Sequence, residues 1–405
     1  MNDLGEVLVT GLGALTPLGA DATTTWAAML AGTSGVRRLE EDWAAELPVS
    51  VAAGLAVDPL SLLARVEARK LDRCEQLALI TCREAWQDAG APEVAPERLA
   101  VVIGTGAGGV LSTLNQDDTF EKGGSRRLSP YAVPMLMPNG PAAWVSMELG
   151  ALGGARTPVS ACASSAEAIA MGLDLIRAGR ADVVVAGGTE ACLHPFTLGA
   201  FAQMKALSTE DKDPAAVSRP FDVDRSGFVM GEGAGLLVLE RAEFARARGA
   251  RVYGAVAGAA VTSSADHITA SDVAGQVRAI ENALRDAELS RSDIGVVHAH
   301  ATSTPPGDLA EAQAVARAIG THPVVTATKS MTGHMFGASG AIGAMAALLA
   351  LYDGTVPATR NLDRLDPAVP LDVVAGENRT GSWDAALANS FGFGGHNVSL
   401  VLKRA

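Results

Sequence analysis

The chain has 405 residues, of which 48% are hydrophobic and 19% are charged, so its composition is that of a folded globular protein and excludes a disordered one. The formal charge of −13 argues against a nucleic-acid-binding surface, although it leaves room for a local basic patch. The four cysteines form no CxxC pair, which gives no support to a zinc or dithiol redox site and is typical of a reducing cytoplasm. We therefore expect a cytoplasmic protein.

The N-terminus has neither a basic segment nor a long apolar run, so we expect no secretory signal peptide. The apolar segment at residues 338–352 is rich in Gly and Ala and is too short to cross a bilayer comfortably. It is therefore predicted to be a core helix. We expect neither a membrane nor a nucleic acid as a partner.

The first half of the chain alternates strands with helices. Trp26 and Leu30 lie four residues apart in a helix predicted for residues 24–31, and a second helix, residues 73–89, ends at Gly90. Short apolar runs predict strands at residues 7–10, 99–103, 182–186 and 234–239.

The second half repeats these elements in the same order. Its strands are predicted at residues 253–261, 294–300, 324–328, 387–392 and 396–403. This duplication predicts two halves, residues 1–250 and 251–405, with two similar sheets packed around shared helices. Since equivalent strand ends should meet where the halves join, residues 329–340 are predicted to face the turn at Cys162.

Cys162 lies where a short extended run, residues 157–160, turns into a predicted helix. The unpaired N–H groups and partial positive charge of a helix N-terminus favour a thiolate, so we expect a lowered pKa for this cysteine. Its Ala and Ser neighbours leave room for a substrate carbonyl. The alternative is a buried, inert cysteine.

Two histidines of the second half lie in loops next to small residues and hydroxyls. His300 ends an apolar strand, and His334 precedes an apolar helix, whereas His298 fits a buried core position. Strand-end loops often carry catalytic groups. With Cys162, these two side chains form a candidate Cys/His/His set for nucleophilic catalysis.

Lys329 and Glu311 are close in sequence to these histidines. They are interpreted either as a buried ion pair that orients the loops or as two surface charges. The glycine-rich loop at residues 389–397 allows backbone N–H groups to approach a ligand. It is a candidate for one oxyanion-hole donor, with the N–H of Cys162 as the other, or else it is a bulge without chemistry.

The glycine run at residues 104–109 suggests a dinucleotide-binding dehydrogenase. It lacks the G-x-G-x-x-G spacing and the acidic residue about twenty positions further on, so we consider that alternative weak. The duplication instead predicts that this loop is a wall of the site opposite His300.

Four motifs together resemble the β-ketoacyl-acyl-carrier-protein synthases of the elongating type, class II. They are Ser-Ala-Cys-Ala-Ser around Cys162, His-Ala-Thr-Ser-Thr from His300, Lys-Ser-Met-Thr-Gly-His ending at His334, and Asn-Ser-Phe-Gly-Phe-Gly-Gly from Asn389. The resemblance implies an α/β thiolase-type fold with two duplicated β/α halves in a layered αβαβα arrangement. It also implies a homodimer and a decarboxylative Claisen condensation in fatty-acid elongation.

The resemblance also implies a role for individual residues. Cys162 accepts the acyl group from the phosphopantetheine arm of acyl-carrier protein, and no separate cofactor or metal takes part. His300 and His334 promote decarboxylation of malonyl-carrier protein, supported by Lys329 and Glu311. The N–H groups of Cys162 and Phe393 form the oxyanion hole. The implied substrate-binding residues are Thr302, Thr304, Phe393 and Gly394.

Several positions depart from the usual family residues. Ala301 stands in place of a Gly, His396 in place of a Thr, Ser226 in place of an Asp, and His298 in place of an Asn. We hypothesise that Ala301 and His396 narrow or re-pattern the malonyl side of the site. Candidate residues for docking the acidic carrier protein are Arg126, Arg127, Lys70 and Arg73.

Three other members of this superfamily are alternatives. A non-catalytic chain-length partner subunit is disfavoured because Cys162, His300 and His334 are all present. A thiolase-like or carrier-independent acyltransferase would be expected to use a second cysteine as its base. A ketosynthase of a polyketide or other specialised pathway shares the same chemistry, so the motifs leave it open.

Overall fold

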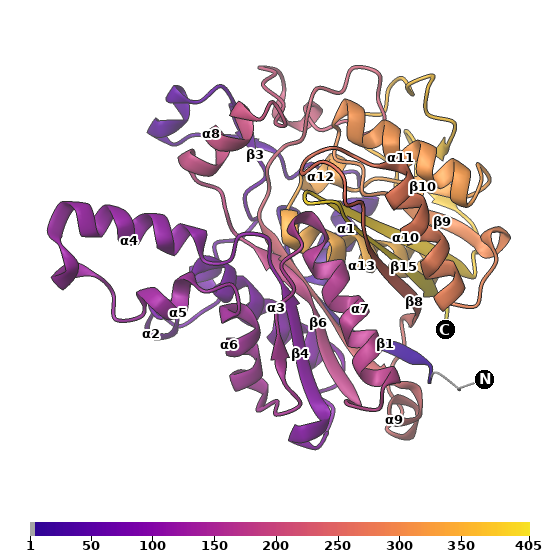
Figure 1. Ribbon diagram of the computed structural model, residues 1–405, viewed down its shortest axis with the longest axis horizontal. Coiled ribbons are helices and arrows are strands. Elements are labelled where there is room, and N and C mark those ends of the chain that lie inside the picture. Colours follow the sequence, from indigo (N-terminus) through magenta and orange to yellow (C-terminus); the bar gives the residue numbers. More distant parts are fainter. Residues whose placement is uncertain (1–4) are drawn as a thin grey trace.

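The computed structural model describes residues 5–405, so the first four residues of the N-terminus, where no signal peptide is expected, lie outside it (Figure 1). The strands of the first half are β1 (Val7–Leu15), β2 (Arg37–Arg38), β3 (Val51–Ala52), β4 (Leu99–Gly104), β5 (Ala155–Arg156), β6 (Val183–Glu190) and β7 (Gly233–Arg241). Those of the second half are β8 (Gly254–Ser263), β9 (Ile294–His298), β10 (Val324–Thr326), β11 (Thr355–Val356), β12 (Asp372–Val373), β13 (Arg379–Thr380), β14 (Ala385–Gly392) and β15 (His396–Lys403).

The two halves have the same strand order. Within the described residues the large sheet runs β12-β10-β9-β14-β15-β8-β1-β7-β6-β4-β5. From β1 outward the first half reads β1-β7-β6-β4-β5, and from β8 outward the second reads β8-β15-β14-β9-β10. Each pairing is parallel or antiparallel in the same way in both halves. The predicted duplication is therefore confirmed.

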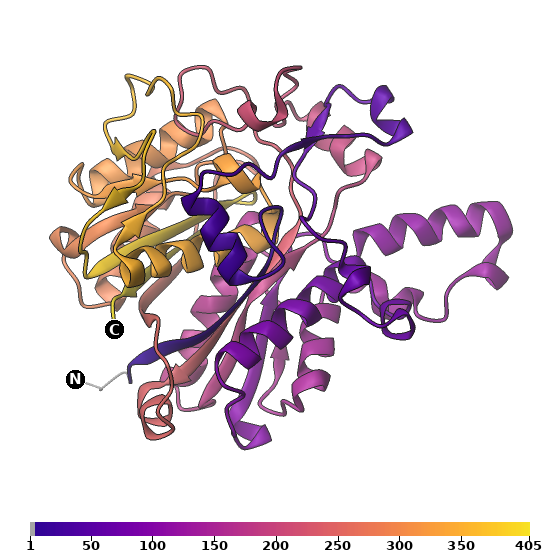
Figure 2. The ribbon, with the colours of Figure 1, turned by 180° about the vertical axis from the view of Figure 1, so that it is seen from behind.

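The two sheets are joined edge to edge, a feature that the sequence pattern did not predict. β1 and β8 pair antiparallel over two residue pairs, Leu8 with Ala255 and Val9 with Gly254. The expected pair of sheets is thus one continuous, strongly bent surface whose two halves lie in different layers (Figures 1 and 2).

Helices separate and cover the two halves of the sheet. In the first half they are α1 (Ala22–Leu30), α2 (Arg65–Ala68), α3 (Arg73–Asp88), α4 (Val110–Gly123), α5 (Ala132–Leu136), α6 (Gly140–Leu149), α7 (Ser164–Arg177), α8 (Pro195–Gln203) and α9 (Ala242–Ala247). In the second half they are α10 (Val273–Asp286), α11 (Pro305–Ala318), α12 (Lys329–Thr332) and α13 (Ser339–Asp353).

The central layer consists of α7 and α13, which pack against each other and against strands of both halves. The largest core cluster lies here and includes Ile169, Leu173, Ile342 and Leu348. Helices α3 and α6 cover the outer face of the first half, and α10 and α11 cover that of the second. Both faces of the sheet are covered at β1, β4 and β6, whose residues are all buried and mostly apolar.

Helix α13 is the apolar segment that was predicted to be a core helix. The stretch 336–353 is long and apolar enough to span a membrane by composition, but 89% of it is buried inside the protein. Its small residues permit close packing, because a Cβ on Gly340 would lie 2.9 Å from the Cβ of Ala166 on α7. It is therefore the buried partner of α7.

Helices α4 and α5 form an arm that extends away from the rest of the protein (Figure 1). Ser112 is the one buried residue of α4, and Phe120 and Val133 are more than half exposed. The sequence analysis did not predict this arm, since α4 has no apolar stripe of the kind that packs on a core.

Candidate active site

Cys162 lies in a single 3₁₀ turn, Ala161–Ala163, between β5 and α7. Ala161 has a φ of 52°, a left-handed conformation that is unfavourable for a residue with a side chain. The Ser164 hydroxyl holds this turn by donating to the carbonyl of Ala161 at 2.7 Å and by accepting the N–H of Ser160 at 3.0 Å. The cysteine is thereby fixed at a sharp corner. The strand expected at residues 157–160 is in fact β5, slightly earlier in the chain.

The second half contributes His334 to this corner. Its Nε2 lies 2.9 Å from the Sγ of Cys162, and its Nδ1 lies 3.1 Å from the hydroxyl of Ser339. The predicted meeting of residues 329–340 with the Cys162 turn is therefore confirmed. The ring of His334 also stacks on Phe336 with 4.8 Å between centroids, which limits its rotation.

His300 lies beside this pair at the end of β9. Its ring centroid is 5.5 Å from that of His334, and the two rings are nearly perpendicular. Nδ1 of His300 is buried without a hydrogen-bond partner in residues 5–405. The ring of His300 lines the same cavity as Cys162 and His334.

Lys329 and Glu311 were predicted to be either a buried ion pair that orients the loops or two surface charges, and their burial rules out the surface interpretation. Both side chains are buried, but no salt bridge joins them within the described part of the chain. Instead, Lys329 Nζ donates to the carbonyl of His300 at 2.5 Å, and Glu311 accepts the N–H of His300 at 2.8 Å. Glu311 also accepts the N–H of Ala301 at 2.7 Å. The two charges therefore hold the main chain of His300 from both ends.

The expected lowering of the Cys162 pKa is also wrong in direction. Burial raises the pKa of this thiol to about 12, which outweighs the opposing effects of Lys329 and of the backbone N–H groups of Phe393 and Cys162. Burial, reinforced by the charge of Lys329, holds the pKa values of His300 and His334 well below their usual range. At neutral pH the resting site is thus a neutral thiol beside two neutral imidazoles.

The glycine-rich loop approaches the cysteine turn from β14. A Cβ on Gly392 would lie only 2.6 Å from the carbonyl oxygen of Ser160, so glycine is required for this approach. The backbone N–H groups of Phe393 and Cys162 both act to lower the pKa of the Cys162 thiol, against the larger effect of burial. These are the two groups that the sequence predicted as oxyanion-hole donors.

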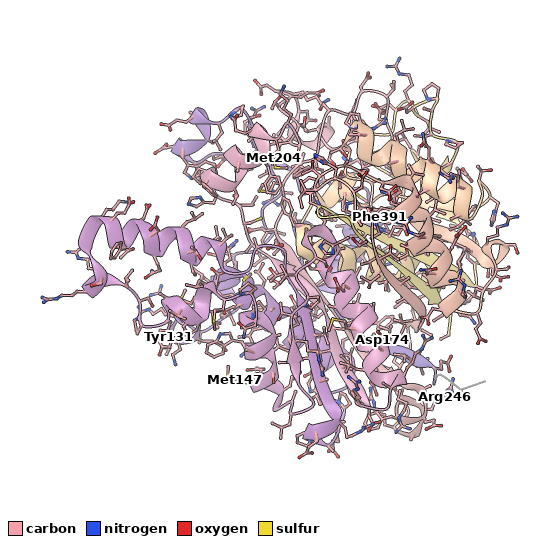
Figure 3. The ribbon with its side chains drawn as sticks, in the orientation of Figure 1. Tyr131, Met147, Asp174, Met204, Arg246 and Phe391 are labelled. Carbon is pink, nitrogen blue, oxygen red and sulfur yellow. The ribbon has the colours of Figure 1, made fainter. Side chains whose placement is uncertain are left out.

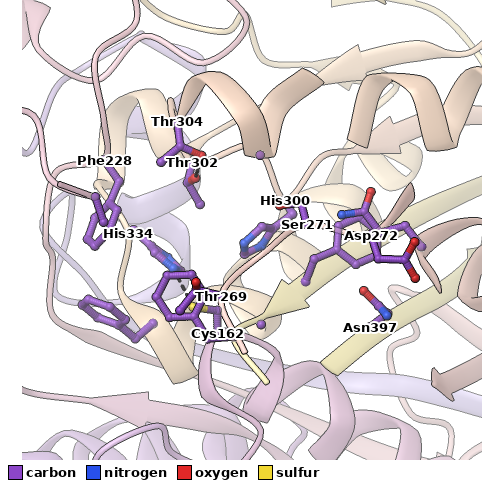
Figure 4. A pocket seen from close by; sticks show the side chains of 17 residues that line it. Cys162, Phe228, Thr269, Ser271, Asp272, His300, Thr302, Thr304, His334 and Asn397 are labelled. Carbon is purple, nitrogen blue, oxygen red and sulfur yellow. Dashed lines mark hydrogen bonds between the residues drawn. The ribbon is translucent and has the colours of Figure 1, made fainter. Parts of the chain in front are cut away.

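A cavity of about 90 Å³ opens onto these groups (Figure 4). Cys162, His300, His334 and the predicted substrate-binding residues Thr302, Thr304 and Phe393 all line it. Gly394 does not line it, and its N–H donates to the carbonyl of Ile268 at 2.6 Å. The sequence analysis missed Phe228, Gln276 and Asn397, three further wall residues from distant parts of the chain.

The glycine run at residues 104–109 does not line the cavity, so the predicted wall opposite His300 is wrong. This loop surrounds Glu190, a fully buried carboxylate that the sequence analysis overlooked. Glu190 accepts the N–H groups of Gly106 at 2.7 Å, Ala107 at 3.1 Å and Gly337 at 2.9 Å. Its hydrogen bonds therefore connect the loop at Gly106 in the first half with the loop at Gly337 in the second half, next to the cysteine turn.

The positions that depart from the family pattern do not contact the cavity either. Ala301 is buried behind His300, and His396 begins β15 without lining the cavity. The hypothesis that they narrow the site directly therefore has no support in the geometry. Ser226 pairs its hydroxyl with that of Ser208 at 2.8 Å. His298 is a core residue, as the composition of its strand suggests, with Nε2 2.8 Å from the hydroxyl of Thr328.

Donor atoms of Cys162, His300 and His334 lie within 4.8 Å of one another. Thiolate and imidazole are ligands that Zn²⁺ accepts, so this set has the composition of an incomplete zinc site. The absence of a catalytic metal stays a prediction that rests on the resemblance.

Two family descriptions match the chain. Residues 5–245 match the beta-ketoacyl synthase N-terminal domain, and residues 253–363 match the beta-ketoacyl synthase C-terminal domain. The chain belongs to the beta-ketoacyl synthase family.

Relatives in this family match nearly the whole chain. It is 44% identical over 404 residues to 3-oxoacyl-[acyl-carrier-protein] synthase 2 of Mycobacterium tuberculosis (strain ATCC 25618 / H37Rv), covering 98% of this chain and 97% of the relative. It is 40% identical over 407 residues to the protein of that name from Synechocystis sp., covering 98% of each.

Solved structures of beta-ketoacyl synthases share the fold. The beta-ketoacyl synthase from Burkholderia phymatum STM815 superimposes with a TM-score of 0.93 at 34% identity, covering 99% of this chain and 100% of that one. A ketosynthase solved with its type II PKS acyl-carrier protein and a hexaketide superimposes with a TM-score of 0.92 at 29% identity, covering 99% of each chain. The family's thiolase-type fold is therefore the fold of this chain.

Proposed function

We propose that this chain is a 3-oxoacyl-acyl-carrier-protein synthase of the elongating type, acting in fatty-acid synthesis. The observation that carries the proposal is the 2.9 Å separation of Cys162 Sγ and His334 Nε2, with His300 beside them on the same cavity. A thiol with two neutral imidazoles suits acyl transfer followed by decarboxylative condensation.

The first step transfers an acyl group from a carrier thioester to Cys162. Because burial keeps the thiol protonated, its proton passes to Nε2 of His334 as sulfur attacks the carbonyl. Ser339 already accepts the N–H of Met335, and its hydroxyl can accept Nδ1–H of His334 as well, which leaves Nε2 free to take that proton. The leaving carrier thiolate then receives the proton, so the step is neutral overall.

The oxyanion of this step would sit between the N–H groups of Cys162 and Phe393. A Cβ on Gly392 would lie 3.2 Å from the backbone nitrogen of Cys162, so the two backbone segments that carry these N–H groups are already close together before substrate arrives. Donors that are fixed in advance cost no reorganisation when charge develops on the oxygen.

The second step joins a malonyl unit to the bound acyl group. Cleavage of the carboxylate as carbon dioxide leaves an enolate on the malonyl thioester, and His300 and His334 would donate to its oxygen. This contact requires His334 to carry its proton on Nε2, so the Nδ1 proton is given up to water, Nε2 takes a proton from water, and the Ser339 hydroxyl rotates to donate to Nδ1. The enolate carbon attacks the Cys162 thioester, the C–S bond breaks, and the sulfur regains a proton from water.

Lys329 and Glu311 serve as positioning residues in this scheme. They bind the main chain of His300 and do not line the cavity. We expect no separate cofactor, because both substrates arrive on the phosphopantetheine arm of acyl-carrier protein.

Carrier docking would use the basic residues around the arm. Arg126 and Arg127 are exposed, and Lys70 Nζ lies 5.9 Å from the ring centroid of Tyr131, which brings α2 to the same surface. Arg73 is unsuited to this role because its guanidinium is held by Glu232 at 2.7 Å. Reversing the charge of Arg126 and Arg127 should raise KM for carrier-bound acyl groups. Reversing the charge of the exposed Lys403 should leave this KM unchanged.

A homodimer is part of the proposal. The arm and the neighbouring β5 edge expose the apolar side chains Phe120, Val133, Met147 and Leu152 (Figure 3 shows Met147 at this side). An apolar face of this kind, beside an unpaired strand edge, is typical of a surface that a second copy covers. Sedimentation of Val133→Asp and Met147→Asp variants would test it. A cytoplasmic location stays a prediction from the cysteine pattern.

A ketosynthase of a polyketide pathway is the second candidate. It is favoured by the similarity to the ketosynthase solved with a hexaketide, at 29% identity, although the 44% identical relatives favour the first. Incubation with malonyl-carrier protein and acyl-carrier proteins of different chain lengths, with mass spectrometry of products, separates the two. A single 3-oxoacyl product supports the first, and poly-β-keto products support the second.

A further inference from the structure

Gln276 is a buried amide that no step of the proposed reaction uses. Its residue is 2% exposed on the first turn of α10, and its side chain lines the cavity with Cys162 and His300. Oε1 is buried without a hydrogen-bond partner among residues 5–405. Buried amide oxygens are almost always paired, so this one lacks a partner that the cavity would have to supply.

The surroundings of Gln276 also offer hydrogen-bond acceptors, beside the hydroxyls of Thr269 and Ser271, which can donate or accept. The side-chain amide of Asn397 donates to the hydroxyl of Ser264 at 3.0 Å and to the carbonyl of Gly395 at 3.1 Å. Its Oδ1 is therefore the atom that remains for a ligand. Asp272, a carboxylate, caps α10 by accepting the N–H groups of Ala274 and Gly275. Figure 4 places Asp272 and Asn397 on the opposite side of His300 from Phe228.

The cavity is therefore divided by the reacting groups. On one side of His300 its walls are the rings of Phe228 and Phe336, which suit a hydrocarbon chain. On the other side stand Asn397 and Asp272, whose side chains carry oxygen acceptors (Figure 4). Gln276 follows Asp272 by one helical turn, with its backbone N–H donating to the carbonyl of Asp272 at 3.1 Å. The charge of Asp272 is paired with Arg278 at 3.7 Å, so the groups that remain for a ligand on this polar side are the amide oxygens of Gln276 and Asn397, which suit a neutral N–H or O–H group.

We propose that Gln276, with Asn397, forms a donor-selective subsite that recognises a neutral N–H or O–H group of the thioester substrate. The subsite determines specificity and takes no part in bond making. Two sources of this chemistry exist, namely an amide N–H of the carrier's arm and a hydroxyl or amide N–H on the acyl chain. The inference rests on the proposed function for its choice of substrate, but its test does not depend on turnover.

The test measures binding and condensation separately on the full chain. The first ligand pair is two non-reactive thioether analogues of the pantetheine arm, one with the amide nearest the sulfur and one with an ester in its place. The second pair is hexyl and 5-hydroxyhexyl thioethers of the same arm. Dissociation constants from NMR titration are compared for the wild type, Gln276→Met, Gln276→Glu and the surface control Gln87→Met.

The wild type and Gln87→Met should prefer the donor-bearing ligand of one pair by about tenfold, the effect of one hydrogen bond. Gln276→Met should abolish this preference, and Gln276→Glu, which keeps an acceptor oxygen, should retain it. The pair that responds identifies the source. The inference is overturned if the wild type, Gln276→Met and Gln276→Glu all show the same preference between the two ligands of each pair. Failure of the wild type to condense carrier-bound substrates would instead reject the proposed function.

Discussion

Lys329 and Glu311 bind opposite ends of the same residue, His300, and not each other. The ammonium holds the carbonyl of His300 and the carboxylate holds its N–H, so the backbone of the histidine is fixed between two buried charges of opposite sign. This arrangement explains how a loop residue at a strand end keeps one position while two different substrates enter the cavity.

Replacing Glu311 by Gln should weaken this hold. A glutamine offers one acceptor oxygen where Glu311 uses two, so either the N–H of His300 or that of Ala301 loses its partner. We expect a loss of about 1–3 kcal/mol in the free energy of unfolding, the usual cost of one unsatisfied buried donor. Urea denaturation measures it. Condensation should fall more than acylation of Cys162, and an equal fall in both rates would contradict a role in positioning His300.

The reactivity of Cys162 should rise with pH without levelling off between pH 6 and 9. Alkylation requires the thiolate, and burial raises the pKa of this thiol to about 12, so its thiolate fraction is small throughout this range. Rates of carbamidomethylation by iodoacetamide, followed by peptide mass spectrometry, provide the measurement. A plateau below pH 8 would mean that the turn before α7 stabilises the thiolate more strongly than burial opposes it.

His298 should make the protein less stable in acid. Burial lowers its pKa to about 3 from the usual 6.5 of a histidine, so below pH 6.5 the unfolded chain takes up a proton that the folded protein does not. The contribution of His298 to the free energy of unfolding is fully present above pH 6.5. It declines by about 1.4 kcal/mol per pH unit as the pH falls toward 3. We therefore expect wild type to lose about 2 kcal/mol more than His298→Asn between pH 6.5 and 5. Parallel stability curves for the two proteins would refute this.

Gly337 should not tolerate a side chain. A Cβ there would lie 2.5 Å from the backbone nitrogen of Gly106 and 2.8 Å from the carboxylate of Glu190. We expect Gly337→Ala to cost about 1–3 kcal/mol of unfolding free energy through overpacking, and to lower activity because Glu190 lies beneath the cysteine turn. Gly199→Ala in α8 is the matched control, since its Cβ would meet nothing closer than 3.6 Å. A control that is as unstable as Gly337→Ala would show that the space around Glu190 is not the cause.

Sequence patterns predicted the parts of the fold that repeat. The order of strands from β8 to β15 follows that from β1 to β7, because each apolar run keeps the same neighbours in both halves. The same symmetry predicted that His334 meets Cys162. The edge pairing of β1 with β8 was not predictable, since it involves only two residue pairs and leaves no periodic pattern.

Predictions failed where a three-dimensional environment decides the property. The pKa of Cys162 depends on its burial among residues from distant segments, which the local turn does not reveal. Glu190 appeared in sequence as one acid at the end of a strand, and its contacts with Gly106 and Gly337 come from loops 84 and 147 residues away. No element was predicted around Gln276, whose burial depends on the packing of α10 against distant parts of the chain.

The most direct test of the proposed reaction is the mass of the Cys162 peptide, measured after incubation with an acyl-carrier thioester and again after addition of malonyl-carrier protein. We predict an acyl adduct on Cys162 that is absent in Cys162→Ala, present in a Cys192→Ala control, and converted to a 3-oxoacyl-carrier product longer by two carbons. An adduct on another residue, or an acylated Cys162 that malonyl-carrier protein does not discharge, would contradict it.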